Sequence, residues 1–249
     1  MGTAGSKESK YYSDFEAKLP SLEGKNVAIT GCTSGTGLVA AKCAARKGAS
    51  TILMLNRPSE RATKAEEMVK AEAKSSSTVV ETISCDLQSF ESVDKAAETI
   101  KRKHKKLDVL CNNGGVMALE DKATIDGYDV QMQTNHLGHF RLTAALFPLL
   151  KAAPEGRIVH HSSLVRQGGP LKPEYFGKNG GNLGGNGNSI FGGARWERYH
   201  QSKLANATMT LALAEKLKGT NVKAACAAPG AAQTNLQENP RTASCVHCL

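Results

Sequence analysis

Long apolar runs are missing from this sequence. No segment reaches the roughly 18 consecutive apolar residues that a membrane-spanning helix needs, and residues 1–15 hold no apolar run of the kind found in secretory signals. The first 25 residues contain four acidic residues and no arginine, which argues against a transit peptide. We therefore expect a cytoplasmic protein without a membrane span.

Paired cysteines are missing as well. The seven cysteines are odd in number and are scattered through segments with the pattern of core strands and helices, which favours buried thiols in a reducing compartment over a disulfide framework. Cys245 and Cys248 have the spacing of a metal-binding pair, but no second pair completes four ligands. The sequence therefore predicts no metal site.

Acidic residues are fewer than basic ones, which leaves a net charge of +9 and raises the question of an anionic partner. The densest basic cluster, "KRKHKK" at 101–106, follows an amphipathic segment and contains no aromatic residue. This pattern is typical of the solvated C-terminal end of a helix, where cations also suit the helix dipole. Because no nucleic-acid-binding motif is present, we expect no nucleic-acid partner.

Short apolar runs alternate with longer amphipathic stretches along the 249 residues, 40% of which are hydrophobic. This alternation predicts a doubly wound parallel α/β sheet of Rossmann type, with about six strands, helices on both faces, and ligands at the carboxyl ends of the strands. The expected strands are 26–30, 50–56, 78–84, 107–113, 156–163 and 221–230. The expected helices are 35–48, 59–74, 89–105, 126–152 and 197–218.

The chain reads as one domain over residues 24–236, with a polar extension at 1–23 and a short tail at 237–249. One segment breaks the alternation. Residues 167–195 hold ten of the 24 glycines and two of the eight prolines, with few apolar groups to offset the entropy of ordering them. We expect this glycine-rich segment to be a long loop or a mobile lid.

The first expected strand leads directly into "TGCTSGTG" at 30–37 and then into a helix. Gly31, Gly35 and Gly37 would allow a tight turn and bring backbone amides against a pyrophosphate, with the positive helix N-terminus facing the anion. Their spacing differs from the usual dinucleotide-binding fingerprint. An ordinary strand-to-helix turn therefore stays open on this motif alone.

"RYHQSKLAN" at 198–206 places Tyr199 and Lys203 four residues apart on an expected helix, so that both side chains share one face. A phenol at its free pKa of about 10 is a poor acid for neutral pH. A cation one helical turn away favours the phenolate and lowers that pKa. The pair therefore indicates general acid–base chemistry, with an ordinary amphipathic pair as the alternative.

Further motifs follow the later strands in a fixed order, and together they resemble the short-chain dehydrogenase/reductase family over residues 24–236. The residues of these motifs are most similar to those of family members of the retinol dehydrogenase, WW-domain oxidoreductase and protochlorophyllide reductase type. The motifs are "CDL" (85–87), "NNGG" (112–115), "TNHLGHF" (134–140), "VHHSS" (159–163), "YHQSK" (199–203) and "PGAAQT" (229–234).

The resemblance implies a role for each catalytic candidate. Tyr199 would be the general acid/base, and Lys203 would lower its pKa while holding the nicotinamide ribose. Ser163 would hydrogen-bond the carbonyl oxygen, with Ser162 as the competing serine, and Asn135 would hold the water of a proton relay. The four histidines near these motifs are expected to be packing or surface residues: His136, His139, His160 and His161.

Cofactor choice depends on the end of the second strand, which reads "LNRPSER". NAD-dependent relatives place an aspartate there, whereas this chain has Asn56 and Arg57, and an arginine fork can pair with a 2′-phosphate. We therefore expect NADP rather than NAD. By resemblance the cofactor lies against Gly31, Ser34, Gly35, Thr36, Gly37, Arg57, Asp86, Leu87, Asn113, Gly114, Tyr199, Lys203, Pro229, Gly230 and Thr234.

Three departures from the family pattern stand out. Gly114 takes a position that is usually alanine, Ser163 and Tyr199 are 36 residues apart, and only fifteen residues follow "PGAAQT". The resemblance predicts an NADP-dependent oxidoreductase that transfers a hydride between nicotinamide and a carbonyl or alcohol, with an apolar retinoid, steroid or lipid-like substrate. A nucleotide-binding regulatory or scaffold protein of the same fold is the alternative, and a homo-oligomer stays open.

Overall fold

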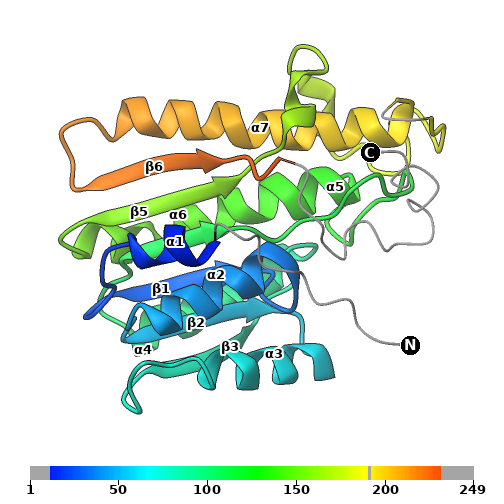
Figure 1. The fold of residues 1–249 in the computed structure, drawn as a ribbon. Helices are drawn as coiled ribbons and strands as arrows, with labels where there is room; N and C mark the ends of the chain where they lie inside the picture. Colours follow the sequence, from blue (N-terminus) through cyan, green and yellow to red (C-terminus); the bar gives the residue numbers. More distant parts are fainter. Residues whose placement is uncertain (1–11, 190–191, 231–249) are drawn as a thin grey trace.

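The computed structural model describes residues 12–189 and 192–230, which form a six-stranded parallel sheet (Figure 1). The strand order is β3-β2-β1-β4-β5-β6. Successive strands are added on one side of β1 up to β3 and on its other side from β4 onward, which makes the gap between β1 and β4 the topological switch point. The predicted doubly wound fold is confirmed. The strands are β1 (Asn26–Thr30), β2 (Thr51–Asn56), β3 (Val79–Ser84), β4 (Val109–Asn112), β5 (Gly156–His161) and β6 (Val222–Ala227).

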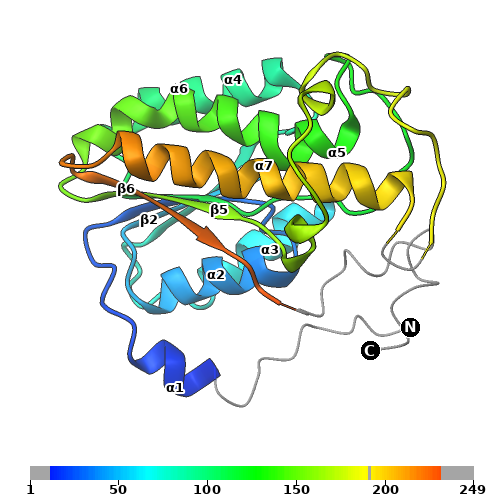
Figure 2. The same cartoon turned by 90° about the horizontal axis from the view of Figure 1, so that it is seen from above.

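Helices cover both faces of the sheet (Figure 2). On one face, apolar side chains of β1, β2 and β3 pack against α2 (Gly35–Arg46) and α3 (Glu60–Lys70). On the other face, a second apolar cluster joins the strands to α4 (Phe90–Lys103), α6 (Gly138–Ala152) and α7 (Ala194–Lys216). Central strands buried on both faces explain the continuous apolar runs that predicted them.

The expected polar extension contains a helix that the sequence pattern did not indicate, α1 (Tyr12–Ala17). It has no buried face, which is why it shows no apolar periodicity. Both carboxylate oxygens of Glu16 accept hydrogen bonds from Arg46 of α2, at 2.6 and 2.7 Å. A bidentate ion pair, rather than an apolar contact, therefore joins α1 to the domain.

The expected helix 126–152 is interrupted. It consists of α5 (Val130–Met132), a π-helical turn (Gln133–Leu137) and then α6. Asp129 caps α5 by accepting hydrogen bonds from the amides of Gln131 and Met132, at 3.0 and 2.8 Å. The π turn holds the motif residue Asn135, and such turns often occur at functional sites.

The glycine-rich segment 167–195 is more closely packed than its composition indicated. Tyr175 and Leu183 are each more than nine-tenths buried and form an apolar cluster with Met132 and Ala205. The segment is therefore anchored at these two residues, and its expected mobility stays a prediction. Within the ranges that the structure describes, no helix combines the length and apolar character needed to cross a membrane.

Candidate active site

The turn between β1 and α2 requires glycine at two positions. Gly31 has a φ of 71°, and a Cβ atom there would lie 2.7 Å from the Cα of Gly114. A Cβ atom at Gly37 would lie 2.2 Å from the carbonyl oxygen of Gly31. The turn therefore packs the start of α2 directly against β1 and leaves the first helical amides at the surface of the turn, where an anion can bind.

The end of β4 is hydrogen-bonded to this glycine turn. The side-chain amide of Asn113 donates to the carbonyl oxygens of Thr30 and Gly31, at 2.9 and 3.3 Å, and its oxygen accepts from the Thr36 hydroxyl at 2.8 Å. The amide of Gly114 donates to the Thr30 hydroxyl at 2.8 Å. Residues from "NNGG" and "TGCTSGTG" are thus joined by hydrogen bonds into one wall, and their role in a cofactor site stays a prediction.

Arginines follow β2 on both sides of the start of α3. Arg57 is exposed, and Arg61, in the first turn of α3, donates a 3.3 Å hydrogen bond to the hydroxyl of Ser34 at the start of α2. Asn56 is buried, and its side-chain oxygen accepts from the amide of Cys32 at 2.7 Å. Arg61 was not among the predicted cofactor residues, although it lies in the same "LNRPSER" segment as Arg57.

The remaining predicted cofactor residues are spread along the same edge of the sheet. Leu87 is buried, and the half-buried Asp86 accepts a 3.0 Å hydrogen bond from the amide of Gln88. Pro229 and Gly230 follow β6 and are exposed. Thr234 lies outside the residues that the structure describes, as do Cys245 and Cys248.

Helix α7 carries both Tyr199 and Lys203 into the interior, where they are 6% and 5% exposed. The Lys203 ammonium lies 5.7 Å from the centroid of the Tyr199 ring and donates a 3.2 Å hydrogen bond to the carbonyl oxygen of His161, the last residue of β5. The predicted shared face of the helix is therefore present, and it points to the carboxyl end of β5.

The two serines after β5 have different partners. The Ser162 hydroxyl donates a 2.7 Å hydrogen bond to the backbone carbonyl of Lys203 and is buried. The Ser163 hydroxyl instead accepts a 3.3 Å hydrogen bond from the amide of Val165 and lies close enough to the phenol of Tyr199 to lower its pKa. The geometry therefore places Ser163, rather than Ser162, beside the candidate proton donor.

Asn135 lies on the opposite side of the same site. Its side-chain amide donates to the Ser202 hydroxyl and to the carbonyl oxygen of Val116, both at 2.9 Å, and its oxygen accepts from the Val116 amide at 2.8 Å. A Cβ atom at Gly115 would lie 3.0 Å from this oxygen and 3.3 Å from the Lys203 ammonium. Asn135 and Lys203 therefore face each other across Gly115, where a Cβ atom would be in tight contact with both side chains.

Burial controls the titration of Tyr199 and Lys203. It raises the pKa of Tyr199 above its ordinary value, and the Ser163 side chain only partly opposes this. It also lowers the pKa of Lys203 to about 8. The expectation of a lowered Tyr199 pKa is therefore wrong for this structure, because burial disfavours the phenolate more than the Ser163 side chain favours it.

Histidine side chains pack near Tyr199 and Lys203, between the helices and the carboxyl ends of the strands. His139 is fully buried, and its ring bonds the Thr30 hydroxyl at 2.8 Å and the carbonyl oxygen of Asn135 at 2.9 Å. The His161 ring bonds the side chain of Asn113 at 3.0 Å. Burial lowers the pKa of His139 to about 3 and that of His161 to about 4. These rings are neutral packing groups that connect β1, β4 and α6.

Comparison with known proteins agrees with this geometry. The short chain dehydrogenase family model matches residues 25–176. Retinol dehydrogenase 12 of Bos taurus is 34% identical over 216 residues, which are 86% of this chain and 64% of that protein. The chain thus spans less than two thirds of the length of this curated relative.

Two solved structures are similar as well. An uncharacterized protein from Mycobacterium paratuberculosis superposes with a TM-score of 0.72 at 34% identity, covering 91% of this chain and 76% of that one. A short chain dehydrogenase from Escherichia coli CFT073, complexed with NADPH, has a TM-score of 0.64 at 25% identity, covering 84% of this chain and 78% of that one. With its glycine turn, its Ser163, Tyr199 and Lys203 set, and its match over 25–176, the chain belongs to the short-chain dehydrogenase family.

Proposed function

We propose that the protein is an NADP-dependent oxidoreductase that transfers a hydride between nicotinamide and the carbonyl or alcohol carbon of an apolar small molecule. The observation that carries the proposal is the meeting of Ser163, Tyr199 and Lys203 at the carboxyl end of β5, two strands away from the glycine turn that follows β1. A dinucleotide laid across this edge would extend from the turn to the catalytic pair.

The residues at the edge of the sheet fit such a cofactor. The glycine turn has no room for side chains at Gly31 and Gly37, which allows a diphosphate to approach the backbone. Arg57 and Arg61 supply two cations after β2, where a 2′-phosphate would lie. Positions 56 and 57 are asparagine and arginine, so no acidic residue there would repel that phosphate. The similar protein complexed with NADPH supports the same preference.

Bound NADPH supplies the hydride in the reductive direction. Ser163 donates a hydrogen bond to the carbonyl oxygen, and Tyr199 transfers its proton to that oxygen as the alcohol forms. Lys203 stabilises the resulting phenolate, which raises the acidity of the phenol only while charge develops. A water held by Asn135, across Gly115 from Lys203, would then pass a proton from solvent to the Lys203 ammonium, which reprotonates Tyr199.

The surroundings of Tyr199 support an apolar substrate. Its ring packs edge-to-face against Trp196 with centroids 5.9 Å apart, and the same cluster includes Ala118, Met117 and Val165. A substrate whose carbonyl approaches the phenol would meet this apolar wall. The retinol dehydrogenase name of a relative is consistent with a substrate of this class.

A cofactor-consumption screen tests the proposal. NADPH oxidation is followed over a panel of aldehydes and ketones that includes retinal and short polar carbonyls, for the unmutated protein and for Tyr199→Phe. We expect reduction of apolar carbonyls and a loss of about 10²- to 10⁴-fold in the phenylalanine variant, with NADPH binding retained. Tight NADPH binding without reduction of any carbonyl would instead favour a nucleotide-binding regulatory protein.

A further inference from the structure

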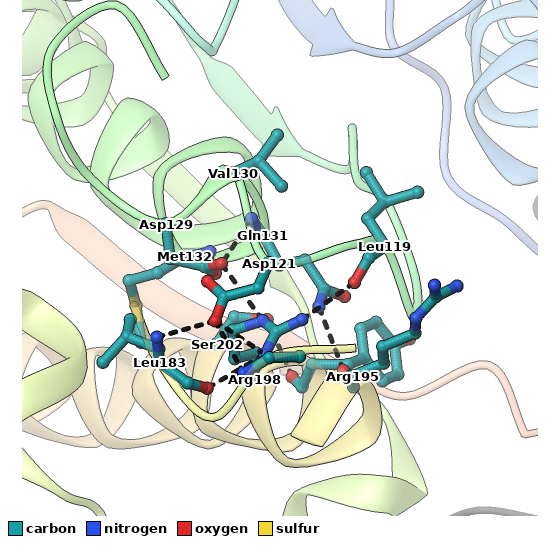
Figure 3. A network of polar contacts seen from close by, with 12 residues as sticks. Leu119, Asp121, Asp129, Val130, Gln131, Met132, Leu183, Arg195, Arg198 and Ser202 are labelled. Carbon is teal, nitrogen blue, oxygen red and sulfur yellow. Dashed lines mark hydrogen bonds and ion pairs between the residues drawn. The ribbon is translucent and has the colours of Figure 1, made fainter. Parts of the chain in front are cut away.

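Arg198, the residue before Tyr199, is the largest fully buried side chain in the described part of the protein. Its guanidinium donates hydrogen bonds to three backbone carbonyls (Figure 3). One nitrogen donates to Leu183 and Gly185, both at 2.9 Å, and the other terminal nitrogen donates to Leu119 at 3.1 Å. A single side chain therefore connects the first turns of α7 to two segments distant in sequence.

Two buried carboxylates lie within ion-pair distance of this guanidinium. Asp129 lies 3.3 Å from its Nε atom and Asp121 lies 3.7 Å from a terminal nitrogen, with side-chain exposures of 0% and 3%. Burial raises the pKa of Asp129 to about 6, although the nearby arginine and two backbone amides lower it. All three side chains are buried, so removing the guanidinium would leave two carboxylates without their cation.

Each carboxylate also fixes backbone of its own. Asp121 accepts hydrogen bonds from the amides of Leu183 and Gly185, at 2.7 and 2.8 Å, so the glycine-rich segment is bound through both its carbonyls and its amides. Asp129 caps α5, which leads into the π turn that holds Asn135. The arginine and its two carboxylates therefore join the elements carrying Tyr199 and Asn135.

We infer that Arg198 is a positioning residue for the proposed reaction, and that with Asp121 and Asp129 it clamps the glycine-rich segment onto α7 beside Tyr199. The clamp sets the placement of the phenol and of the apolar wall around Trp196 relative to Ser163 and Asn135. Arg198 contributes no group to the glycine turn, so its effect is on turnover rather than on cofactor binding. This inference rests on the proposed function only where kcat is measured, because the hydrogen-exchange test needs no activity.

Arg198→Met tests the clamp, measured against Arg141→Met, which removes an exposed arginine paired with Asp94. We expect Arg198→Met to lower kcat about tenfold or more while the Kd for NADPH stays within about twofold. Hydrogen exchange at the amides of Leu183 and Gly185 should accelerate in this variant and not in the control. Unchanged exchange at these amides would overturn the clamp.

Adding Asp129→Asn to Arg198→Met separates positioning from simple stabilisation. The asparagine oxygen retains the cap of α5 and one of the two buried negative charges is removed, while Asp121 keeps its hydrogen bonds from the amides of Leu183 and Gly185, so part of the lost thermal stability should return. Because the carbonyls of Leu183, Gly185 and Leu119 still lack their donor, kcat should stay low. Recovery of kcat together with the melting temperature would mean that Arg198 only stabilises the fold, and the inference would fail.

Arg198→Lys provides the test if the methionine variant does not fold. Lysine keeps the charge but cannot reach three carbonyls through separate nitrogens. A lowered kcat at a nearly unchanged melting temperature supports positioning, and an unchanged kcat contradicts it. If the unmutated protein reduces no carbonyl, the proposed function fails, and the exchange rates of Leu183 and Gly185 in the lysine variant still decide whether the clamp exists.

Discussion

The ammonium of Lys203 lies 5.7 Å from the centre of the Tyr199 ring, and both side chains are almost completely buried. No carboxylate of the described residues lies within ion-pair distance of this lysine. Its partner is instead the carbonyl oxygen of His161, at 3.2 Å. The protein therefore holds a desolvated cation beside a phenol, an arrangement that costs stability and that the proposed proton transfer would use.

Lys203→Met should stabilise the folded protein at neutral pH while abolishing turnover. The pKa of Lys203 falls from 10.5 to about 8 on folding, so burial of the charged form costs about 3 kcal/mol below pH 8. This cost disappears as the pH rises from about 8 to 10.5, because the folded protein then binds fewer protons than the unfolded chain. Denaturant unfolding without cofactor measures the free energy of unfolding of both proteins at pH 7 and at pH 10. A methionine variant less stable than the unmutated protein at pH 7 would contradict the assignment.

Ser163→Ala and Ser162→Ala should separate catalysis from stability. Loss of the Ser163 hydroxyl removes a donor to the reacting oxygen and should lower kcat by about 10²- to 10³-fold with little change in melting temperature. Loss of the Ser162 hydroxyl removes its bond to Lys203 and should cost about 1 kcal/mol of stability. Kinetics with a substrate from the carbonyl screen, together with thermal melts, show which serine affects turnover and which affects stability. The reverse pattern would make Ser162 the catalytic serine.

Arg57→Ala and Arg61→Ala should each reduce the preference for NADPH over NADH. One charge-assisted pair is worth about 1.5 to 3 kcal/mol, so each variant should lose roughly tenfold or more in NADPH affinity with little effect on NADH. Fluorescence titration with both cofactors measures the ratio. Lys64→Ala, which removes another exposed cation from the same helix, is the matched control. Equal affinities for both cofactors in the unmutated protein would refute the NADP assignment.

The protein should lose stability as the pH falls below 6.5. His139, His160 and His161 are buried and neutral, with pKa values of about 3, 4 and 4, so the unfolded chain binds up to three more protons than the folded one between about pH 4 and 6.5. Between pH 7 and 5.5 this amounts to about 3 kcal/mol. Urea unfolding at both values checks it, and His160→Asn should remove about a third of the loss. A flat profile would show that the rings are charged or accessible.

The strands were predictable because burial on both faces gives them continuous apolar runs, as in Thr51–Asn56, where every residue is buried. Their ends were less predictable. The last residues of the expected strand 221–230 lie beyond β6, since Pro229 and Gly230 pair with no neighbouring strand. Apolar composition alone does not show where the backbone hydrogen bonds of a sheet stop.

The candidate site was predictable where its residues are close in sequence and not where they meet over long distances. Tyr199 and Lys203 could be paired from their i+4 spacing alone. The bond between Arg198 and the carbonyl oxygen of Leu119 spans 79 residues and has no local pattern. The raised pKa of Tyr199 was likewise missed, because it depends on how completely the fold excludes water.

The π turn at Gln133–Leu137 fixes the length of this part of the chain. It already holds one residue more than an ordinary helical turn, so adding another would rotate everything after it by about 100°. Gly138, whose Cβ position lies 2.7 Å from the carbonyl oxygen of Leu87, would then give way to Leu137 at that contact. A leucine side chain cannot occupy a position that excludes a methyl group. Single-residue insertions in the turn should therefore be among the least tolerated changes, whereas substitutions at exposed Phe140 should be accepted.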